Sequence, residues 1–349
     1  MSYQYLFDLI NVGFGALQEY LALHVLLCLI PAFFLAGAIA SLFSKESVLS
    51  FFGSETPKYI SYPVAAISGC MLAVCSCTVL PLFAGIFRRG AGIGPATTFL
   101  FAAPAINILA IVYTAKILGY DLGVARAVVA ISFSVAIGIT MAAIFERQSS
   151  KRDGIQAFGE EKHNHSVYLF LLLLAILILP EFIHGWLLLA IAEVPLIFLT
   201  TYMSFKWFSK EELESWMSET WFLVKQITPL LLIGVFAAGI IVELLPAELV
   251  ASAVGGESFS SNLVASVAAA LMYFSTLTEV PIIGALTELG MGRGPALAML
   301  LAGPALSLPN MIVISRIMGI QKGLTYIFLV VLVASIAGFA FGGSYAHSL

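Results

Sequence analysis

The chain reads CSCTVLPLFAGIFRRGAGIGPATTFLFAAPAINILAIVYTAKILG over residues 75–119 and STLTEVPIIGALTELGMGRGPALAMLLAGPALSLPNMIVISRIMG over residues 275–319. The two stretches align without a gap at a constant offset of 200, and 13 of the 45 positions are identical. Most of the identical positions hold Gly, Pro or Ala, which shared hydrophobicity alone does not favour. A weaker match at an offset of 202 continues upstream to Phe34 and Phe236. The repeat predicts a chain built from two homologous halves.

The composition is that of a membrane protein. Of the 349 residues, 60% are apolar and 10% are charged, and the mean hydropathy is +1.02. A soluble domain averages about 45–50% apolar and about 25% charged residues. The 16 basic and 20 acidic side chains are too few to cover a soluble protein of this size. This excludes a cytosolic enzyme, a disordered tail protein and a basic nucleic-acid-binding protein.

Ten apolar stretches separated by polar clusters predict the membrane-spanning helices, at roughly 20 residues for each crossing. They cover residues 21–44, 63–87, 95–118 and 123–145, two stretches within 167–205, and residues 220–245, 262–286, 295–318 and 323–346. We therefore expect an all-α polytopic membrane protein of about ten transmembrane helices. Two homologous four-helix halves would be joined by a two-helix linker.

Polar segments divide the chain into five parts. These are an N-terminal interfacial helix at residues 1–20, the first half at 21–145, a polar cytoplasmic loop at 146–166, a linker hairpin with an interfacial helix at 167–219, and the second half at 220–349. The first part carries no Lys or Arg, so it does not have the pattern of a cleavable signal peptide. The segment 206–219 is amphipathic, which predicts a helix lying at the membrane surface.

The Lys and Arg residues indicate the orientation. With ten crossings, one side of the membrane holds ten of the 16, including Arg293, and the other side holds six, including Arg126. The positive-inside rule then places both termini in the cytoplasm. A nine-crossing topology divides the same charges eight and eight, so ten crossings are favoured. Ten crossings make the two halves parallel, whereas one crossing more or fewer inverts them, and inverted repeats are common in transporters.

Proline interrupts the apolar stretches at matching positions of both halves. Pro81 and Pro281 form one pair, and Pro104 and Pro304 form the other. Each proline removes a backbone donor and displaces the carbonyl four residues earlier, and in lipid the freed groups must face protein or water. Paired Pro-broken helices near the bilayer midplane are typical of a transporter's substrate site. The alternative is a pair of kinked packing helices with small residues at close contacts.

Cys75 and Cys77 form the most distinctive local motif. On a regular helix the two side chains would point about 200° apart, but a segment unwound near Pro81 would present both thiols to one ligand. Thiols and thiolates select soft ions such as Cu(I), Zn and, by the same argument, trivalent arsenic. The two residues are therefore candidate metal or metalloid ligands. A plain packing role is the alternative, because free Cys is common in buried helices.

Glu279 is the second candidate, because it is a carboxylate within an apolar stretch. It stands at the position equivalent to Val79, while Ser275 and Leu277 occupy the positions of the two thiols. A carboxylate at this depth is costly and points to a function. Burial favours its protonated form, so Glu279 could exchange a proton during transport. Alternatively, a protonated Glu279 would bond a backbone carbonyl freed by Pro281.

Small polar side chains accompany the proline breaks and complete the predicted substrate site. They are Thr78 and Thr278 before the first pair of prolines, Asn107 after Pro104, and Ser307 and Asn310 after Pro304. Their amides and hydroxyls would coordinate the substrate, satisfy the broken backbone, or do both.

No cofactor is expected. The turns GAGIGP at residues 90–95 and GMGRGP at residues 290–295 resemble phosphate-binding loops only superficially, because no Lys-Ser/Thr pair follows them and no strand precedes them. A membrane thiol oxidoreductase that uses Cys75 and Cys77 is the alternative of another class, although such enzymes usually carry a Cys-x-x-Cys motif.

The repeated motif also resembles a known family. The residues that carry the resemblance are CSCTVLPLFAGIFRRGAGIGPATTFLFAAPAINILAIVYT at 75–114, TLTEVP at 276–281 and GRGPALAMLLAGPALSLPN at 292–310. They are similar to the ArsP-type predicted permeases of bacteria and archaea, and the resemblance covers most of residues 24–346. It places the family's Cys-Ser-Cys at Cys75, Ser76 and Cys77, and many relatives have Gly or Ser where this chain has Thr78. It implies an inner-membrane efflux carrier for methylarsenite-like compounds, while related members are assigned to copper or zinc export.

Residues and resemblance together predict a multi-pass permease of a prokaryotic plasma membrane, and not an enzyme. The leading hypothesis is a secondary efflux carrier for soft, thiol-reactive solutes such as trivalent organoarsenicals, which would confer arsenical resistance. A carrier of Cu or Zn ions, or of a small sulfur-containing or anionic metabolite, is the alternative. The expected partners are a small-molecule or metalloid substrate and the lipid bilayer, with no nucleic acid. Whether the chain forms a homo-oligomer stays open.

Overall fold

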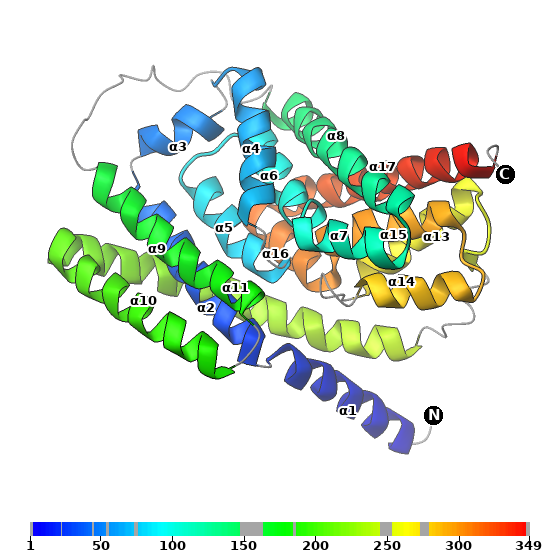
Figure 1. Ribbon diagram of the computed structural model, residues 1–349, viewed down its shortest axis with the longest axis horizontal. Coiled ribbons are helices and arrows are strands. Elements are labelled where there is room, and N and C mark those ends of the chain that lie inside the picture. Colours follow the sequence, from blue (N-terminus) through cyan, green and yellow to red (C-terminus); the bar gives the residue numbers. More distant parts are fainter. Residues whose placement is uncertain are drawn as a thin grey trace.

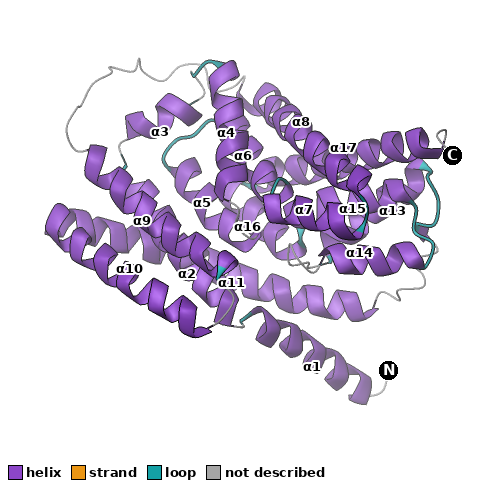
Figure 2. Ribbon diagram, in the orientation of Figure 1, coloured by secondary structure: helices purple, strands orange, loops and turns teal. Residues whose placement is uncertain are grey.

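The computed structural model describes residues 3–21, 23–43, 45–53, 56–72, 76–146, 163–183, 186–244, 253–272 and 279–346. Within these ranges every regular element is a helix, and the remainder is turn or loop (Figure 2). The expected all-α class is therefore confirmed.

The helices fall into three groups along the chain. The first comprises α1 (Tyr3–Tyr20), α2 (Leu23–Ser41), α3 (Lys45–Phe52), α4 (Lys58–Leu72), α5 (Ser76–Arg88), α6 (Ile93–Ala105), α7 (Ile108–Ile117) and α8 (Tyr120–Phe145). The second is the linker hairpin, α9 (His163–Phe182) and α10 (Trp186–Trp207). The third comprises α11 (Lys210–Leu244), α13 (Phe259–Leu271), α14 (Glu279–Glu288), α15 (Arg293–Leu306), α16 (Leu308–Met318) and α17 (Ile320–Ala346). The linker hairpin packs beside α2, on the opposite side of the view from α13 and α15 (Figure 1).

Four of the described helices are long and apolar enough to cross a membrane: α8, α10, α11 and α17. The bent pairs α6–α7 and α15–α16, whose axes turn by 44° and 50°, raise this number to six if each pair is one crossing. A helix rises about 1.5 Å per residue and the apolar core of a bilayer is about 30 Å thick, so one crossing needs about 20 residues. These helices make the chain a polytopic membrane protein.

The helices from α14 to α17 follow those from α5 to α8 at an offset close to 200. α6 and α15 begin 200 residues apart, and so do α8 and α17. The connecting glycines also correspond: Gly90 and Gly290 have φ values of 102° and 103°, and Gly119 and Gly319 have values of 111° and 89°. Side chains with a Cβ are strained at such angles. This requirement explains why glycine stands at all four positions of the aligned stretches.

Residues 63–87, which we expected to cross the membrane once, instead form two short helices that fold back on each other. α4 runs parallel to α6, because Gly94 approaches Tyr62 near the start of both helices and Gly69 approaches Ala103 near the end of both. α5 runs antiparallel to α6, since a tight turn connects them and the two helices pack together. α4 and α5 therefore form a hairpin. With 15 and 13 residues, each is only about 20 Å long, too short to cross.

Residues 262–286, also expected as one crossing, are arranged in the same way. α13 packs along α15, with Asn262 against Gly294 near the start of both helices. The N–H of Gly292, in the turn after α14, donates to the carbonyl of Val254, just before α13, at 3.0 Å. The start of α13 and the end of α14 thus lie together. The expectation of ten crossings is wrong at these two stretches, because an apolar run of this length fits one crossing helix and two half-length helices equally well.

Two half-buried carboxylates mark opposite ends of the molecule. At the first, which we call the Glu146 end, α6 begins and α8 ends, and the N–H of Gly94 donates to Oε1 of Glu146 at 3.4 Å. At the second, which we call the Glu257 end, α15 begins. There the N–H groups of Arg293 and Gly294 donate to the two carboxylate oxygens of Glu257 at 2.7 and 2.8 Å. Each carboxylate satisfies donors that the first turn of a helix leaves unpaired.

α8 and α17 run in opposite directions between these ends. The ammonium of Lys322, at the start of α17, lies 6.0 Å from the ring of Phe145, at the end of α8. Arg293 forms an ion pair with Asp121, at the start of α8, and Gly342, near the end of α17, lies at the Glu257 end. The α5–α8 and α14–α17 units are therefore inverted relative to each other. The parallel arrangement does not occur, because one hairpin that does not cross lies between equivalent helices of the two units, and the number of crossings between them therefore becomes odd.

Basic residues gather at the Glu146 end. Three further contacts bring helix ends there: Arg89 donates to the carbonyl of Ala40, Ser166 donates to that of Leu42, and His165 stacks on Trp207. Eight of the described basic residues lie at this end: Lys45, Lys58, Arg88, Arg89, Lys206, Lys210, Arg316 and Lys322. Only Lys116 and Arg293, among the described ones, lie at the Glu257 end. The charge count that favoured ten crossings therefore fails, since it placed Arg316 and Lys322 opposite Arg88 and Arg89.

The amphipathic segment 206–219 is not a separate interfacial helix. α10 extends to Trp207, and α11 begins at Lys210 and continues for 35 residues. Ser209 and Glu212 fix this start: the N–H of Glu212 donates to the Ser209 hydroxyl at 3.3 Å, and the N–H of Ser209 donates to the Glu212 carboxylate at 2.9 Å. This reciprocal pair is a capping box. The expected boundary between the linker and the second half, at residue 219, thus falls inside α11.

Candidate substrate-translocation site

Arg126 and Glu279 form an ion pair where the two inverted units meet. Arg126 lies on α8, and Glu279 is the first residue of α14. Nη2 of Arg126 lies 3.3 Å from Oε2 of Glu279, and both side chains are 0% exposed. An isolated charge is very costly in a low-dielectric interior, so the charged form of each group depends on the other.

Arg126 also binds the broken helix of its own unit. α6 ends at Ala105 and α7 begins at Ile108, so the carbonyl of Ala105 loses the partner that a continuous helix would give it. Nε of Arg126 donates to this carbonyl at 3.4 Å, and Nη1 donates to the hydroxyl of Thr114 at 3.0 Å. Thr114 in turn donates to the carbonyl of Ala110 at 2.7 Å. One guanidinium thus joins α6, α7, α8 and α14.

Proline explains the break that Arg126 occupies. Pro104 lies in the last turn of α6, where it supplies no N–H and displaces the carbonyl four residues earlier. Asn107 follows, and its Oδ1 accepts the N–H of Ala110 at 3.4 Å, which caps α7. Pro304 lies in the last turn of α15, and Ser307 is the junction between α15 and α16. Helix breaks therefore occur at the matching positions where we expected them.

The other pair of prolines differs between the two units. Pro81 lies inside α5 and is buried, whereas Pro281 is the third residue of α14 and is exposed. A proline in the first turn of a helix breaks no hydrogen bond, because the first N–H groups have no partner within the helix. The carbonyl four residues before Pro281 lies outside the described residues, so the expectation that Pro281 frees a carbonyl for Glu279 stays a prediction.

Helix packing places the remaining predicted residues at two contacts between the units. α7 packs against α14, and α5 packs against α16, so the broken helix of each unit meets the short hairpin of the other. Thr78, Asn107, Ser307 and Asn310 are all buried at these elements. Cys75 and Thr278 lie outside the described residues. Cys77 lies in the first turn of α5, but its side chain is outside the description.

Two buried oxygens at these contacts between the units lack a hydrogen-bond partner among the described residues. They are Oε1 of Glu279 and the hydroxyl oxygen of Ser307. Leaving a buried polar group unsatisfied costs about 1–3 kcal/mol. Such positions are where a proton, a water molecule or a polar group of a solute would bind.

Arg126 is the site residue that the sequence interpretation missed. It was grouped with the loop charges because the fourth apolar stretch begins only three residues before it, at 123. The signal was nevertheless present, since Arg126 stands in the apolar run LGVARAVVAI and an ionisable residue in such a run points to a function. Its equivalent at an offset of 200 is Tyr326, which is 0% exposed and whose hydroxyl has no partner among the described residues.

The described part of the chain offers no assembled metal site. No group of three His, Cys, Asp or Glu side chains in the described ranges lies close enough to hold a metal ion. The predicted ligands, Cys75 and Cys77, stay a prediction. The glycine-rich turn at the start of α15 does not present unpaired donors to a phosphate either, because the N–H groups of Arg293 and Gly294 bind Glu257.

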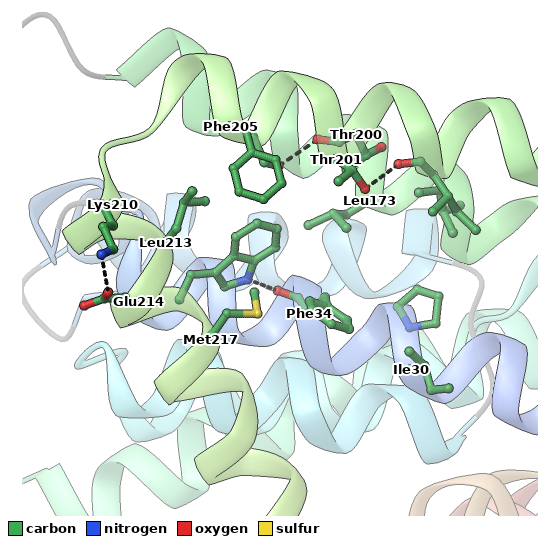
Figure 3. Close-up of a pocket in the computed structure, with 15 residues that line it drawn as sticks. Ile30, Phe34, Leu173, Thr200, Thr201, Phe205, Lys210, Leu213, Glu214 and Met217 are labelled. Carbon is green, nitrogen blue, oxygen red and sulfur yellow. Dashed lines mark hydrogen bonds and ion pairs between the residues drawn. The ribbon is translucent and has the colours of Figure 1, made fainter.

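A cavity of about 670 Å³ lies elsewhere, between the linker hairpin and the helices α2 and α11 (Figure 3). Its lining is mostly apolar and includes Leu173 and Phe205. Nε1 of Trp216 donates to the carbonyl of Phe34 at 2.8 Å along its wall, and Lys210 is among the few charged residues that line it. None of the predicted site residues lines this cavity. We therefore place the candidate site at the Arg126–Glu279 pair.

A polytopic helical bundle with a buried ion pair at a broken helix has the features of a membrane transport protein. Comparison with known proteins agrees. The chain matches the ArsP-type predicted permease family over residues 12–343, and it belongs to that family. It is 46% identical over 354 residues to the UPF0718 protein MJ0584 of Methanocaldococcus jannaschii, and the match covers 97% of each chain. No solved structure matches it.

Proposed function

We propose that the protein is a secondary carrier whose substrate path runs between the α5–α8 and α14–α17 units, at the Arg126–Glu279 pair. The observation that carries this proposal is the fully buried ion pair that joins the two units at a helix break. Ionisable residues inside a membrane protein mark substrate or proton paths by default. Membership of a predicted permease family supports the same role.

The architecture we infer is two homologous, inverted four-helix halves joined by the linker hairpin. The offset of close to 200 in the helix bounds supports it, and so does the reciprocal packing of α5 on α16 and of α7 on α14. In inverted-repeat carriers the substrate binds where discontinuous helices of the two halves meet, and one half moves against the other to expose the site alternately. Such a movement would have to break or rebuild the Arg126–Glu279 contact.

Glu279 is the coupling residue in this proposal. Its carboxylate has one partner, Arg126, and one oxygen, Oε1, without a partner in the described chain. The protonation state of a buried carboxylate depends strongly on a neighbouring opposite charge. When the halves move and Arg126 withdraws, Glu279 would take up a proton, and when Arg126 returns it would release one. Movement of the solute would then be coupled to the uptake and release of a proton at Glu279.

The solute in this proposal is soft and thiol-reactive, such as a trivalent organoarsenical. Cys77 lies in the first turn of α5, a helix that packs against the other unit, and Cys75 directly precedes α5 in the sequence. Two thiols suit trivalent arsenic, and Cu(I) or Zn would be the alternative cargo for the same ligands. A small anionic metabolite is the second candidate solute, because the guanidinium of Arg126 is buried at the site.

We place the carrier in the plasma membrane with its Glu146 end in the cytoplasm. Eight described basic residues lie at that end against two at the other, and positive charge accumulates on the cytoplasmic side. The segment 147–162 joins α8 to α9, both at the Glu146 end, and its sequence carries four more basic residues. The end of α17 lies at the Glu257 end. This placement revises our expectation of a cytoplasmic C terminus.

A tolerance assay tests the proposed function. An arsenical-sensitive bacterial strain expressing the wild-type chain should grow at higher methylarsenite concentrations than the strain with an empty vector. A variant with both Cys75→Ser and Cys77→Ser should lose this advantage, whereas Ser132→Ala, at an exposed position of α8, should keep it. Immunoblots of membranes would show that the variants are equally abundant. If the wild-type chain changes tolerance to none of methylarsenite, Cu and Zn, the soft-solute proposal is wrong.

A further inference from the structure

The Glu279 carboxylate does not saturate the guanidinium of Arg126. Arg–carboxylate pairs are frequently bidentate, with charge-assisted bonds of about 2.7–2.9 Å. Here a single contact of 3.3 Å joins Nη2 to Oε2, and Nη1 and Nε bind the neutral oxygens of Thr114 and Ala105. Among the described residues, one full negative charge therefore faces a cation that is 0% exposed, and the contact of 3.3 Å between them is long for an ion pair. A second carboxylate or an oxyanion would fit the same donors better.

The other unit shows that the fold does not need this ion pair. At an offset of 200, Tyr326 stands where Arg126 does, and Val79 stands where Glu279 does. Tyr326 and Val79 are buried, at 0% and 1% exposure, on helices that correspond to α8 and α14. Replacing a buried ion pair with well-packed neutral residues is often neutral or stabilising. A charged pair that occurs at only one of the two equivalent positions therefore indicates a role in binding rather than in holding the fold together.

Arg126 is the charged group that faces Glu279 from the helices packed against α14. α14 packs against α7 and α15, and Arg126 of α8 reaches it through the break in α6–α7. Lys116 on α7 is exposed near the end of that helix, and Arg293 at the start of α15 is paired with Asp121 at the start of α8. Protonation of Glu279 would thus leave Arg126 as a buried cation without an anion.

We propose that Arg126 binds an anionic group of the transported solute, a carboxylate or an oxyanion, in the state in which Glu279 is protonated. This rests on the proposed function in one respect, that the Arg126–Glu279 pair lies on the substrate path. Solute anion and ionised Glu279 compete for the same guanidinium. The anion would therefore bind when a proton occupies Glu279, and ionisation of Glu279 would expel the anion.

Binding to the purified full-length chain in detergent tests the proposal without any arsenic chemistry. Benzoate and benzamide have similar shapes but differ in charge, and their binding can be measured by thermal shift at acidic and alkaline pH. The wild-type chain should prefer benzoate by at least about tenfold at acidic pH, the ratio expected for one hydrogen bond to a charged group, and should lose this preference at alkaline pH. Glu279→Gln should bind benzoate at both pH values, because no competing charge remains.

The control variant carries, at positions 126 and 279, the residue types that the other unit has at the equivalent positions. In a chain carrying both Arg126→Tyr and Glu279→Val, the pair is replaced by the residues that fill the equivalent buried positions, so the fold should persist. This variant and Arg126→Gln should show no benzoate preference at either pH, while Arg126→Lys should keep part of it. The proposal is overturned if wild type shows no preference at acidic pH, if Arg126→Gln retains it, or if Glu279→Gln remains pH-dependent like wild type.

A matched pair of arsenicals separates this proposal from the proposed function. Phenylarsenite and 4-carboxyphenylarsenite carry the same soft arsenic and differ by one carboxylate. If both are transported and only the difference between them disappears in Arg126→Gln, the anion site and the carrier function are both supported. If both are transported but Arg126→Gln leaves their ratio unchanged, the anion site is wrong and the carrier stands. If neither is transported while benzoate binds as described, the soft-solute function fails and the anion site stands.

Discussion

Replacing both members of the Arg126–Glu279 pair should harm stability less than replacing Glu279 alone. Glu279→Val leaves a buried guanidinium that cannot lose its proton, and removing one partner of a buried pair costs about 3–5 kcal/mol. Adding Arg126→Tyr removes that unpaired charge and supplies the residue that the other unit carries at the equivalent position. The double variant should lose only about 1 kcal/mol, chiefly from the bonds of Arg126 to Ala105 and Thr114.

The assay is thermal or chemical unfolding of the purified chains in the same detergent, with wild type, both single variants and the double variant compared. The second substitution should restore about 2–4 kcal/mol relative to Glu279→Val alone. Arg126→Tyr alone should be the milder single change, because Glu279 becomes neutral by binding a proton. The reasoning is refuted if the double variant is no more stable than Glu279→Val, since the two charges would then not be coupled.

Three further predictions concern the orientation of the chain, a glycine turn and the Asp121–Arg293 ion pair. Because α17 ends at the Glu257 end, we expect the C terminus on the side of the membrane opposite the cytoplasm. Alkaline phosphatase fused there should be active and a fluorescent protein fused there should be dark. The reverse pattern would refute the orientation. Gly290→Ala should lower the free energy of unfolding by about 1–2 kcal/mol, because its φ of 103° disfavours a Cβ even though no atom lies close to that position. Gly15→Ala in α1, where the space is equally open, should leave the thermal unfolding unchanged or raise the stability. Asp121→Asn should lower the free energy of unfolding by no more than about 1 kcal/mol, and by less in high salt, because its pair with Arg293 is about one-third exposed. A loss as large as that expected for Glu279→Val would contradict this.

The sequence predicted the membrane class and the positions of the helix breaks. Composition alone excluded a soluble protein, because so few charges cannot solvate a surface of this size. The breaks at Pro104 and Pro304 followed from the chemistry of proline, which acts locally and is therefore visible without tertiary information. Glu279 was found for a similar reason, since a carboxylate in an apolar run is anomalous wherever it occurs.

The path of the chain across the membrane was not predictable in the same way. Residues 63–87 and 262–286 are apolar enough for a crossing, and only tertiary contacts such as Gly69 with Ala103 show that they fold back. That one difference inverts the second unit and reverses the meaning of the Lys and Arg count. Arg126 was missed because it lies only three residues after the start of its apolar stretch, where a loop charge is expected, and because its partner lies 153 residues away.

The central claim is that Glu279 couples solute movement to protons through Arg126. Purified protein in proteoliposomes tests it most directly, with phenylarsenite uptake measured with and without an imposed pH gradient. Wild type should concentrate the solute only when the gradient is present. Glu279→Gln should still exchange labelled for unlabelled solute across the membrane but should not respond to the gradient. Gradient-driven accumulation by Glu279→Gln equal to that of wild type would contradict the claim.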